Sequence, residues 1–136
     1  MRQQRERGFT IIELIIALFV FVVAGGGIAG ANLYCHRLSE DVTNAMRAVD
    51  DLDDMMEHVQ ATPFSSLQVL FPGGVVNGGG GNAYAAVVGG YTLDGEQIIV
   101  TYPSQTAGRL EMLVTVNWLQ RGRSRSARTA TIRTNG

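Results

Sequence analysis

The chain has 136 residues, which suits one domain of ordinary size, and a formal net charge of −1, so its total charge favours no class of partner. A single cysteine, Cys35, excludes an internal disulfide. The charge is unevenly distributed, since residues 1–8 and 109–136 are rich in arginine and residues 40–57 are acidic. Such runs are either solvated faces or partner surfaces.

Residues 9–31 form an apolar run in which Glu13 is the one charged side chain. A helix needs about 20 apolar residues to cross a hydrocarbon core of about 30 Å, so this run is long enough to span a membrane. Arg2, Arg5 and Arg7 precede it. The positive-inside rule therefore predicts a single-pass protein with a cytoplasmic N-terminus.

Two common membrane-directed segments explain this run less well. A secretory signal peptide has a shorter apolar core of about 7–15 residues. A plain signal anchor fits the length but does not explain an acid inside the run, where a charge costs about 2.5–3.5 kcal/mol. Glu13 is therefore a candidate functional residue. A carboxyl group that snorkels to the bilayer surface or stays protonated is the alternative.

The string RGFTIIELIIAL at residues 7–18 resembles the leader of type IV prepilins and type II secretion pseudopilins. That family has a short basic leader ending in glycine, followed by Phe, Thr and, as the fifth residue after the cut, Glu. Gly8, Phe9, Thr10 and Glu13 occupy those positions. The motif is short but specific, because residue identity, spacing, charge and hydropathy must coincide.

The resemblance implies that a prepilin peptidase cuts between Gly8 and Phe9, that the new amino group of Phe9 is N-methylated, and that the mature chain polymerises. Gly8 has no Cβ, so a protease can approach its backbone closely. We hypothesise that Glu13 pairs with the amino group of Phe9 on a neighbouring subunit, because a buried unpaired carboxylate is costly. Such a pair would favour the correct register in a filament.

An apolar stripe continues the helix beyond the membrane segment. Apolar or small residues recur at spacings of three and four from Ile28 to Val59, and no proline occurs before Pro63. This pattern predicts a helix from about Phe9 to Ala61. We expect the second half to bury its stripe on the chain's own sheet, although a coiled coil has a similar seam. Its members are Val42, Ala45, Met46, Val49, Leu52, Met56 and Val59.

Four glycines interrupt the apolar half of this helix, at Gly25, Gly26, Gly27 and Gly30. Each costs about 1 kcal/mol relative to alanine in a helix interior. They either permit close approach of another helix, as small residues do in membranes, or let the helix loosen when the subunit leaves the bilayer. We favour loosening, because three consecutive glycines exceed what packing needs.

The C-terminal half is expected to be a small antiparallel sheet. Thr62-Pro63 should end the helix, and the glycine-rich residues 73–90 should be a flexible linker. Residues 91–93 and 96–102 are predicted to form a hairpin about Asp94-Gly95, with Pro103 ending its second strand. Residues 109–119 and 125–134 are predicted to be two further strands, joined by a turn at 120–123.

The third of these four strands has the clearest pattern, since apolar residues alternate from Leu110 to Trp118. A period of two with one apolar face is typical of a half-buried strand. An apolar helix stripe and an apolar sheet face are complementary. The sequence therefore predicts an α+β fold in which a long N-terminal helix packs on a small C-terminal antiparallel sheet.

Residue types that carry chemistry do not combine into a catalytic or metal site. His36 and His58 lack the cysteine or acid spacing of a zinc site. The acids at 50–54 lie in the predicted helix and lack the glycine of a calcium loop. We therefore expect no enzyme, no cofactor and no bound metal, and we expect Cys35 to be a small core residue.

Arginines around the last turn form a candidate partner surface, which comprises Arg121, Arg123, Arg125 and Arg128, with Arg133 further along the strand. They could contact the acidic helix face of an adjacent subunit or the phosphates of DNA. The first interpretation is favoured because it uses both charged regions and needs no outside partner. Arginines that protect a sheet edge against aggregation are a third interpretation.

We therefore predict a leader at residues 1–8, a transmembrane and filament-core helix at 9–31, and an extracytoplasmic domain at 32–136. The resemblance implies a structural subunit of a type IV pilus or type II secretion filament, located in the inner membrane with its domain periplasmic or extracellular. Its partners would be other pilin or pseudopilin subunits, prepilin peptidase and the inner-membrane assembly platform.

The paired C-terminal cysteines of many major pilins are lacking, which favours a minor pilin or pseudopilin. Two alternatives stay open. One is a pilin-like adaptor that binds DNA or a surface through the arginine-rich turn, with nucleic acid the less favoured partner. The other is a single-pass membrane-anchored sensor domain.

Overall fold

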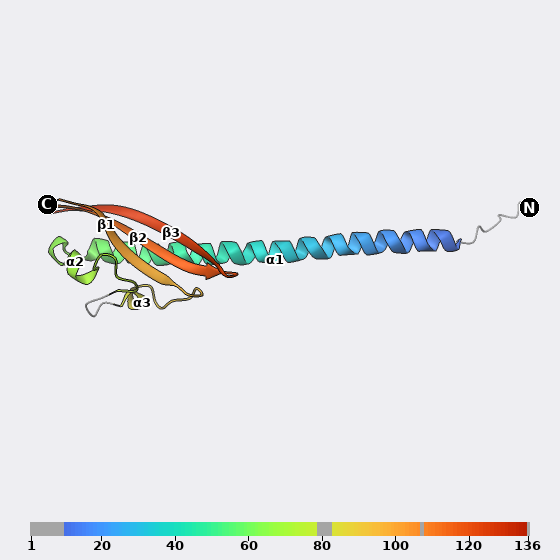
Figure 1. Cartoon of the computed structure of the whole chain (residues 1–136), viewed down its shortest axis with the longest axis horizontal. Helices are drawn as coiled ribbons and strands as arrows, with labels where there is room; N and C mark the ends of the chain where they lie inside the picture. The colour runs from blue at the N-terminus through green and yellow to red at the C-terminus, as the bar shows by residue number, and fades with distance from the viewer. Residues whose placement is uncertain (1–9, 79–82, 107, 136) are drawn as a thin grey trace, which may run out of the picture. The chain divides into compact units, whose positions relative to one another are not determined.

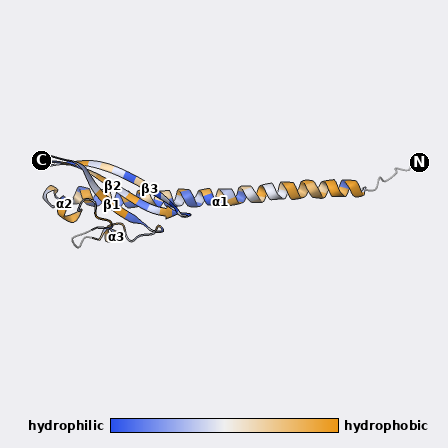
Figure 2. Ribbon diagram, viewed as in Figure 1, coloured by the Kyte–Doolittle hydropathy of each residue, from blue (hydrophilic) through white to orange (hydrophobic). Residues whose placement is uncertain are grey.

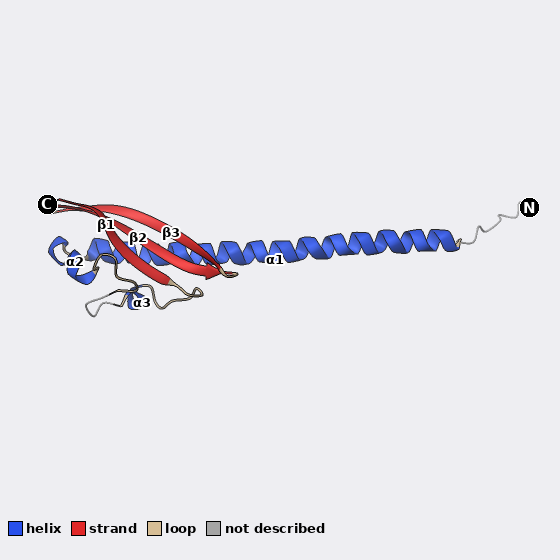
Figure 3. Ribbon diagram, viewed as in Figure 1, coloured by secondary structure: helices blue, strands red, loops and turns tan. Residues whose placement is uncertain are grey.

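The computed structural model describes residues 10–78, 83–106 and 108–135. Helix α1 spans Ile11–Ala61, and the short helical segments η1, α2 and α3 span Phe64–Ser66, Leu67–Leu70 and Tyr84–Val87. Strands β1, β2 and β3 span Gln97–Thr106, Arg109–Gln120 and Arg123–Thr134 (Figures 1 and 3). The predicted α+β class, with a long apolar N-terminal helix and a small antiparallel sheet, is confirmed. The chain divides into two compact units, Met1–Glu40 and Asp41–Gly136.

Helix α1 ends where the proline signal predicts, at Ala61. The Thr62 hydroxyl donates a hydrogen bond of 2.8 Å to the carbonyl of His58, and Arg133 Nη2 donates one of 3.1 Å to the carbonyl of Thr62. These bonds satisfy carbonyl groups that a helix end leaves without intrahelical partners. The predicted helix is confirmed from Ile11 onward, and Phe9 lies outside the described residues.

The sheet has the order β1-β2-β3, with both pairs antiparallel. The predicted alternation of β2 is confirmed, because Leu110, Met112, Val114, Val116 and Trp118 are all buried. Strands β2 and β3 pair without interruption from Arg109 opposite Thr134 to Gln120 opposite Arg123. The last strand thus starts at residue 123, two residues earlier than predicted.

A two-residue turn explains this early start. Arg121 and Gly122 both have positive φ angles, 52° and 72°. That geometry matches the right-handed twist of the flanking strands, so pairing resumes immediately after the turn. Glycine adopts such angles at little cost, whereas arginine does so rarely.

The prediction of four strands is wrong, because residues 91–93 do not form a strand. The Glu96 carboxylate accepts hydrogen bonds of 2.9 Å from the backbone N–H groups of both Thr92 and Leu93, which closes a local turn. The position beside β1 is taken instead by residues 74–77. Gly74 N–H donates to the carbonyl of Val100, and residue 76 pairs with residue 99.

Strand β1 also runs past Pro103, where the prediction ended it, and continues to Thr106. The pairing with β2 shifts register between Thr101 and Ser104, so Pro103 lies in an irregularity of the strand. Proline lacks an N–H group and is tolerated at bulges and on edge strands. Because β1 is at one edge of the sheet order, Pro103 meets both conditions.

The buried face of α1 is rotated by about one residue from the predicted stripe. Its buried positions are Ala48, Asp51, Leu52, Met55 and Val59. Leu52 and Val59 are confirmed as core residues and Met56 is partly buried. The prediction is wrong for the stripe members nearer the N-terminus, which are Val42, Ala45, Met46 and Val49 and are exposed. Cys35, expected in the core, is exposed as well.

The described part of the glycine-rich residues 73–90 is anchored to the core, contrary to the expected free linker. Tyr84 of α3 is fully buried and stacks on Phe71, with ring centroids 5.9 Å apart. Asn77 N–H donates to the carbonyl of Ile98, and its side-chain oxygen accepts the Ile98 N–H, both at 2.8 Å. One core therefore joins the second half of α1, residues 67–78 and 83–93, and the sheet.

Candidate functional site: the start of the long helix and the arginine turn

The first turn of α1 is closed by a reciprocal pair of side chains. The Thr10 hydroxyl accepts the backbone N–H of Glu13 at 3.3 Å, and Glu13 Oε2 accepts the backbone N–H of Thr10 at 3.0 Å. The Thr10 hydroxyl also donates to Glu13 Oε2 at 3.0 Å. This is a capping box, in which two otherwise unpaired N–H groups are satisfied at the start of a helix.

The capping box fixes where the carboxylate of Glu13 is held. Both hydrogen bonds that the Glu13 carboxylate accepts from Thr10 go to Oε2, and the third bond of the box joins the Glu13 N–H to the Thr10 hydroxyl. Oε1 of Glu13 can therefore accept a hydrogen bond from a further donor. Gly8 and Phe9, the predicted cleavage and methylation residues, lie outside the described residues. Thr10 follows Phe9 directly, so the predicted new amino group would be formed one residue before the capping box.

Beyond this turn, α1 presents an apolar surface in all directions. Every large apolar side chain from Ile11 to Val23 is more than half exposed in the chain. Figure 2 shows this part of the helix almost uniformly hydrophobic, whereas the rest of α1 is mixed. Among the described helices, α1 alone is long and apolar enough to cross a membrane.

The glycines of this segment do not break the helix, which is continuous through residues 25–30. Apart from the adjacent residues and the backbone of the same helical turns, no described atom lies within 4 Å of where a Cβ would be placed on Gly25, Gly26, Gly27 or Gly30. Packing within the chain therefore does not require glycine at these positions. Close approach of another helix and loosening of α1 are both compatible with this geometry.

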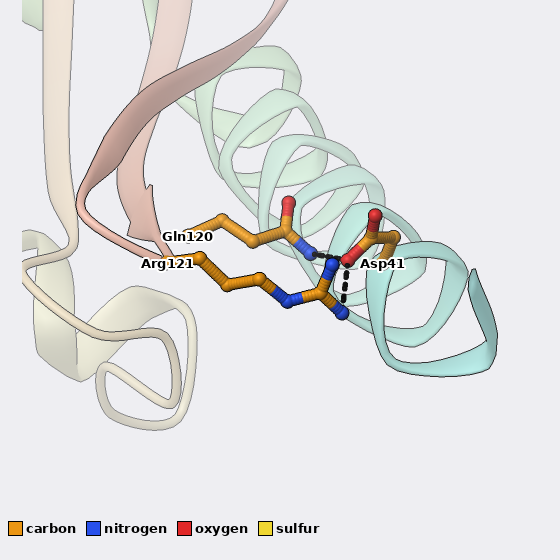
Figure 4. A network of polar contacts seen from close by, with 3 residues as sticks. All are labelled: Asp41, Gln120 and Arg121. Carbon is orange, nitrogen blue, oxygen red and sulfur yellow. Dashed lines mark hydrogen bonds and ion pairs between the residues drawn. The ribbon is translucent and has the colours of Figure 1, made fainter. Parts of the chain in front are cut away.

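The arginine turn between β2 and β3 is tied to the second half of α1. Arg121 Nη2 lies 3.0 Å from Asp41 Oδ1, and Gln120 Nε2 donates a hydrogen bond of 2.7 Å to the same oxygen (Figure 4). The Arg121 and Asp41 side chains are partly exposed. Such an exposed pair contributes only about 0.2–1 kcal/mol.

The other predicted arginines do not share one face. Arg125 lies opposite the buried Trp118, and Arg128 lies opposite Thr115. Directly opposed residues occupy the same face of a sheet, and successive residues alternate between faces. Arg125 therefore lies on the face that covers the core, and Arg128 lies on the outer face.

Arg125 also lines a cleft of about 380 Å³ at this end of the sheet. The other residues of the cleft are Asp41, Val42, Ala45, Trp118, Gln120 and Ser126. Arg123 is opposite Gln120. Arg133, at the far end of β3, is engaged with the carbonyl of Thr62. The arginine cluster of the sequence is thus divided among a turn, two sheet faces and a helix end.

Two residues of this geometry were missed by the sequence analysis. Thr10 was noted only as part of the leader resemblance, although Thr10-x-x-Glu13 before an apolar run is itself a capping-box signal. Asp41 was one of several acids on the helix face, and no pattern singled it out. The pairing of acidic helix and arginine turn was expected between subunits, and the structure contains one such pair within the chain.

Residues 3–29 match the family model described as the prokaryotic N-terminal methylation motif. This motif is the prepilin leader, and it confirms the resemblance to type IV pilin-like proteins. It implies processing by a prepilin peptidase and assembly with other pilins, and together with the apolar helix it indicates membrane anchoring. No curated protein and no solved structure gave a match.

Proposed function

We propose that this chain is a structural subunit, a minor pilin or pseudopilin, of a type IV pilus or type II secretion filament. It joins the filament through α1 after the leader is removed. The observation that carries the proposal is the methylation motif at residues 3–29, placed on an apolar helix with a carboxylate in its first turn. The proposed role is structural and not catalytic.

The capping box supports a specific part for Glu13. Cleavage between Gly8 and Phe9 would create an amino group next to Thr10, at the positive end of the helix dipole. Thr10 holds Glu13 Oε2, which leaves Oε1 for the amino group of Phe9 on a neighbouring subunit. An ion pair in an apolar filament core is favourable only when both charges are present, so it would reject subunits in the wrong register.

The apolar surface of α1 supports polymerisation. Soluble proteins rarely expose such large apolar patches, and those that do use them for membrane or protein contact. A subunit that leaves the bilayer must exchange lipid for other apolar surface, because exposure to water is unfavourable. Neighbouring copies of the same helix provide that surface. Val42, Met46 and Val49, which the globular unit leaves about half exposed or more, extend the apolar area available to neighbours.

The basic leader supports an orientation with the N-terminus in the cytoplasm and residues 32–136 in the periplasm or in an extracellular filament. In this arrangement the prepilin peptidase and the inner-membrane assembly platform meet the N-terminal part of the chain.

A DNA- or surface-binding adaptor is the second candidate, and the arginine geometry favours it less. Phosphate binding is strongest when several cations converge on one backbone. Here Arg121 is paired with Asp41, and Arg125 and Arg128 lie on opposite faces of the sheet. The same arrangement lets Arg125, beside the cleft, meet an acidic side chain of a neighbouring subunit.

The first test is the intact mass of the chain extracted from membranes of cells that contain an active prepilin peptidase. We expect the mass of residues 9–136 plus one methyl group. A Gly8→Val variant is the matched control, because its side chain blocks close approach to the backbone and should keep residues 1–8. If the unaltered chain also keeps residues 1–8, the pilin function is wrong and a membrane-anchored domain is left.

The second test separates processing from assembly. A Glu13→Gln variant keeps the size of the side chain and removes its charge. We expect normal cleavage but loss of co-purification with sheared filaments. A Glu13→Asp variant, which keeps the charge, should retain part of that incorporation. Equal incorporation of Glu13→Gln and the unaltered chain would show that the carboxylate is not used in assembly.

A further inference from the structure

Two acidic side chains are buried at the junction between α1 and the start of the sheet. Asp51 of α1 and Glu96, the residue before β1, are each only 6% exposed. A buried carboxylate is costly unless it is paired with a cation or satisfied by donors. The charged groups that act on Asp51 are Glu96, Asp54 and Asp50, which are all acids. The pair therefore needs another source of stabilisation.

One oxygen of Glu96 is satisfied and one is not. Its Oε2 accepts the backbone N–H groups of Thr92 and Leu93 at 2.9 Å each. Among the described residues, no donor reaches Glu96 Oε1 or Asp51 Oδ2, and both atoms are buried. After burial and the charge of Glu96, a hydrogen bond to Glu96 raises the pKa of Asp51, so the two carboxyl groups are close neighbours.

We propose that Asp51 and Glu96 share one proton and thereby form a pH-dependent clasp between α1 and the turn that leads into β1. Two ionised carboxylates are both acceptors and cannot bond to each other, whereas a protonated carboxyl group donates. A proton on Asp51 Oδ2 donated to Glu96 Oε1 would satisfy both buried atoms at once. Its loss would leave two like charges buried together.

Burial, followed by the charge of Glu96 and the hydrogen bond to it, raises the pKa of Asp51 to about 7. Asp54 and Asp50, on the same helix, act in the same direction. On the loop side, Tyr91 is a neutral phenol at these pH values, since burial and then Glu96 raise its pKa. Each charged group that acts on Asp51 thus favours its protonated form.

The sign of the pH dependence follows from this raised pKa. Between about pH 4 and pH 7 the folded chain holds a proton that the unfolded chain has already released, so its stability falls as pH rises through that window. Glu96 lies between the buried residues Leu93 and Ile98. Repulsion from Asp51 would therefore disturb the turn and the first residues of β1. The packing of the sheet against α1 thereby becomes less stable as the pH of the compartment that the domain faces rises.

The test uses the full chain in detergent micelles, with chemical unfolding followed by the fluorescence of Trp118, the chain's one tryptophan, which is buried. We expect the folding equilibrium constant to fall by roughly tenfold or more between pH 5 and pH 8. In Asp51→Asn the amide donates to Glu96 at every pH, so the fall should shrink to about twofold or less. Asp53→Asn, an exposed acid on the same helix, should keep the full fall.

Histidines titrate in the same range, so the diagnostic quantity is the difference in slope between Asp51→Asn and Asp53→Asn. Equal slopes would overturn the clasp. Stabilisation of the unaltered chain, but not of Asp51→Asn, by added calcium at pH 8 would also overturn it and identify a cation site instead. If Asp51→Asn does not fold, infrared absorption of Glu13→Gln decides, because this variant lacks the carboxyl group of the apolar helix: a protonated carboxyl band at pH 6 supports the clasp, and its absence refutes it.

Discussion

Removal of the phenol oxygen is predicted to have opposite effects on stability at Tyr84 and at Tyr102. Tyr84 is fully buried, and among the described residues no group reaches its hydroxyl as a hydrogen-bond partner. The Tyr102 hydroxyl donates to the carbonyl of Phe71 at 2.7 Å and also approaches that of Leu67 at 3.3 Å. We therefore expect Tyr84→Phe to be neutral or stabilising and Tyr102→Phe to be destabilising.

The magnitudes follow from the partners of each hydroxyl. A buried polar group without a partner costs about 1–3 kcal/mol, so its removal from Tyr84 should change the unfolding free energy by between about zero and +1 kcal/mol after the packing change. Loss of the Tyr102 hydrogen bond should cost about 1 kcal/mol, because it leaves the carbonyl of Phe71 without this donor. The Leu67 carbonyl still accepts the N–H of Phe71 at 2.8 Å.

The assay is chemical unfolding of each full-length variant in detergent micelles, followed by Trp118 fluorescence and fitted as two states. Burial raises the pKa of both phenols to about 12, so neither ionises at neutral pH. The two variants should differ by about 1–2 kcal/mol, with Tyr84→Phe the more stable. The reasoning is refuted if Tyr84→Phe loses as much stability as Tyr102→Phe.

Four further substitutions test the packing and the polar contacts in the same unfolding assay. Met55→Ala should lower the unfolding free energy by about 2–5 kcal/mol because Met55 is fully buried. Met46→Ala, at a position 63% exposed on the same helix, should change it by no more than about 0.5 kcal/mol. The reverse order would mean that the stripe predicted from the sequence is the buried one. Arg133→Ala should cost about 1 kcal/mol through the lost bond to the carbonyl of Thr62, and an unchanged midpoint would contradict this. Asp41→Asn should cost less than about 1 kcal/mol, since its ion pair is partly exposed, and a larger loss would mean that the pair is shielded from water.

The fold class followed from patterns that are local in sequence. The alternation from Leu110 to Trp118 identified the central strand and its buried face, and Pro63 marked the end of α1. Asp94-Gly95 does form a turn, as its composition predicts. It does not join two strands, because Glu96 occupies the N–H groups that a strand at 91–93 would need. A competing side-chain acceptor is not visible in propensity or periodicity.

Of the candidate site, only the residues of the leader motif could be predicted from the sequence. The leader string identified Gly8, Phe9 and Glu13 as positions of cleavage, methylation and assembly, and these assignments stay predictions for the individual residues. The partner of Arg121 could not be inferred, since Asp41 is about 80 residues away in sequence and one acid among several. Which arginines share a face depends on the register of β3 against β2, and that register is set by the two-residue turn.

The rotation of the buried face of α1 links the stability of the domain to its proposed assembly. Periodicity alone allowed stripes through 45, 49, 52 and 56 or through 48, 52, 55 and 59, because both have helical spacing. The sheet covers the second stripe, which places Asp51 in the core and leaves Val42, Met46 and Val49 outside it. Burial of an isolated acid is costly. The apolar stripe without Asp51 would therefore have been the more favourable face of α1 to bury on the sheet. A stripe kept outside the domain remains available to neighbouring subunits, as the proposed polymerisation through α1 requires.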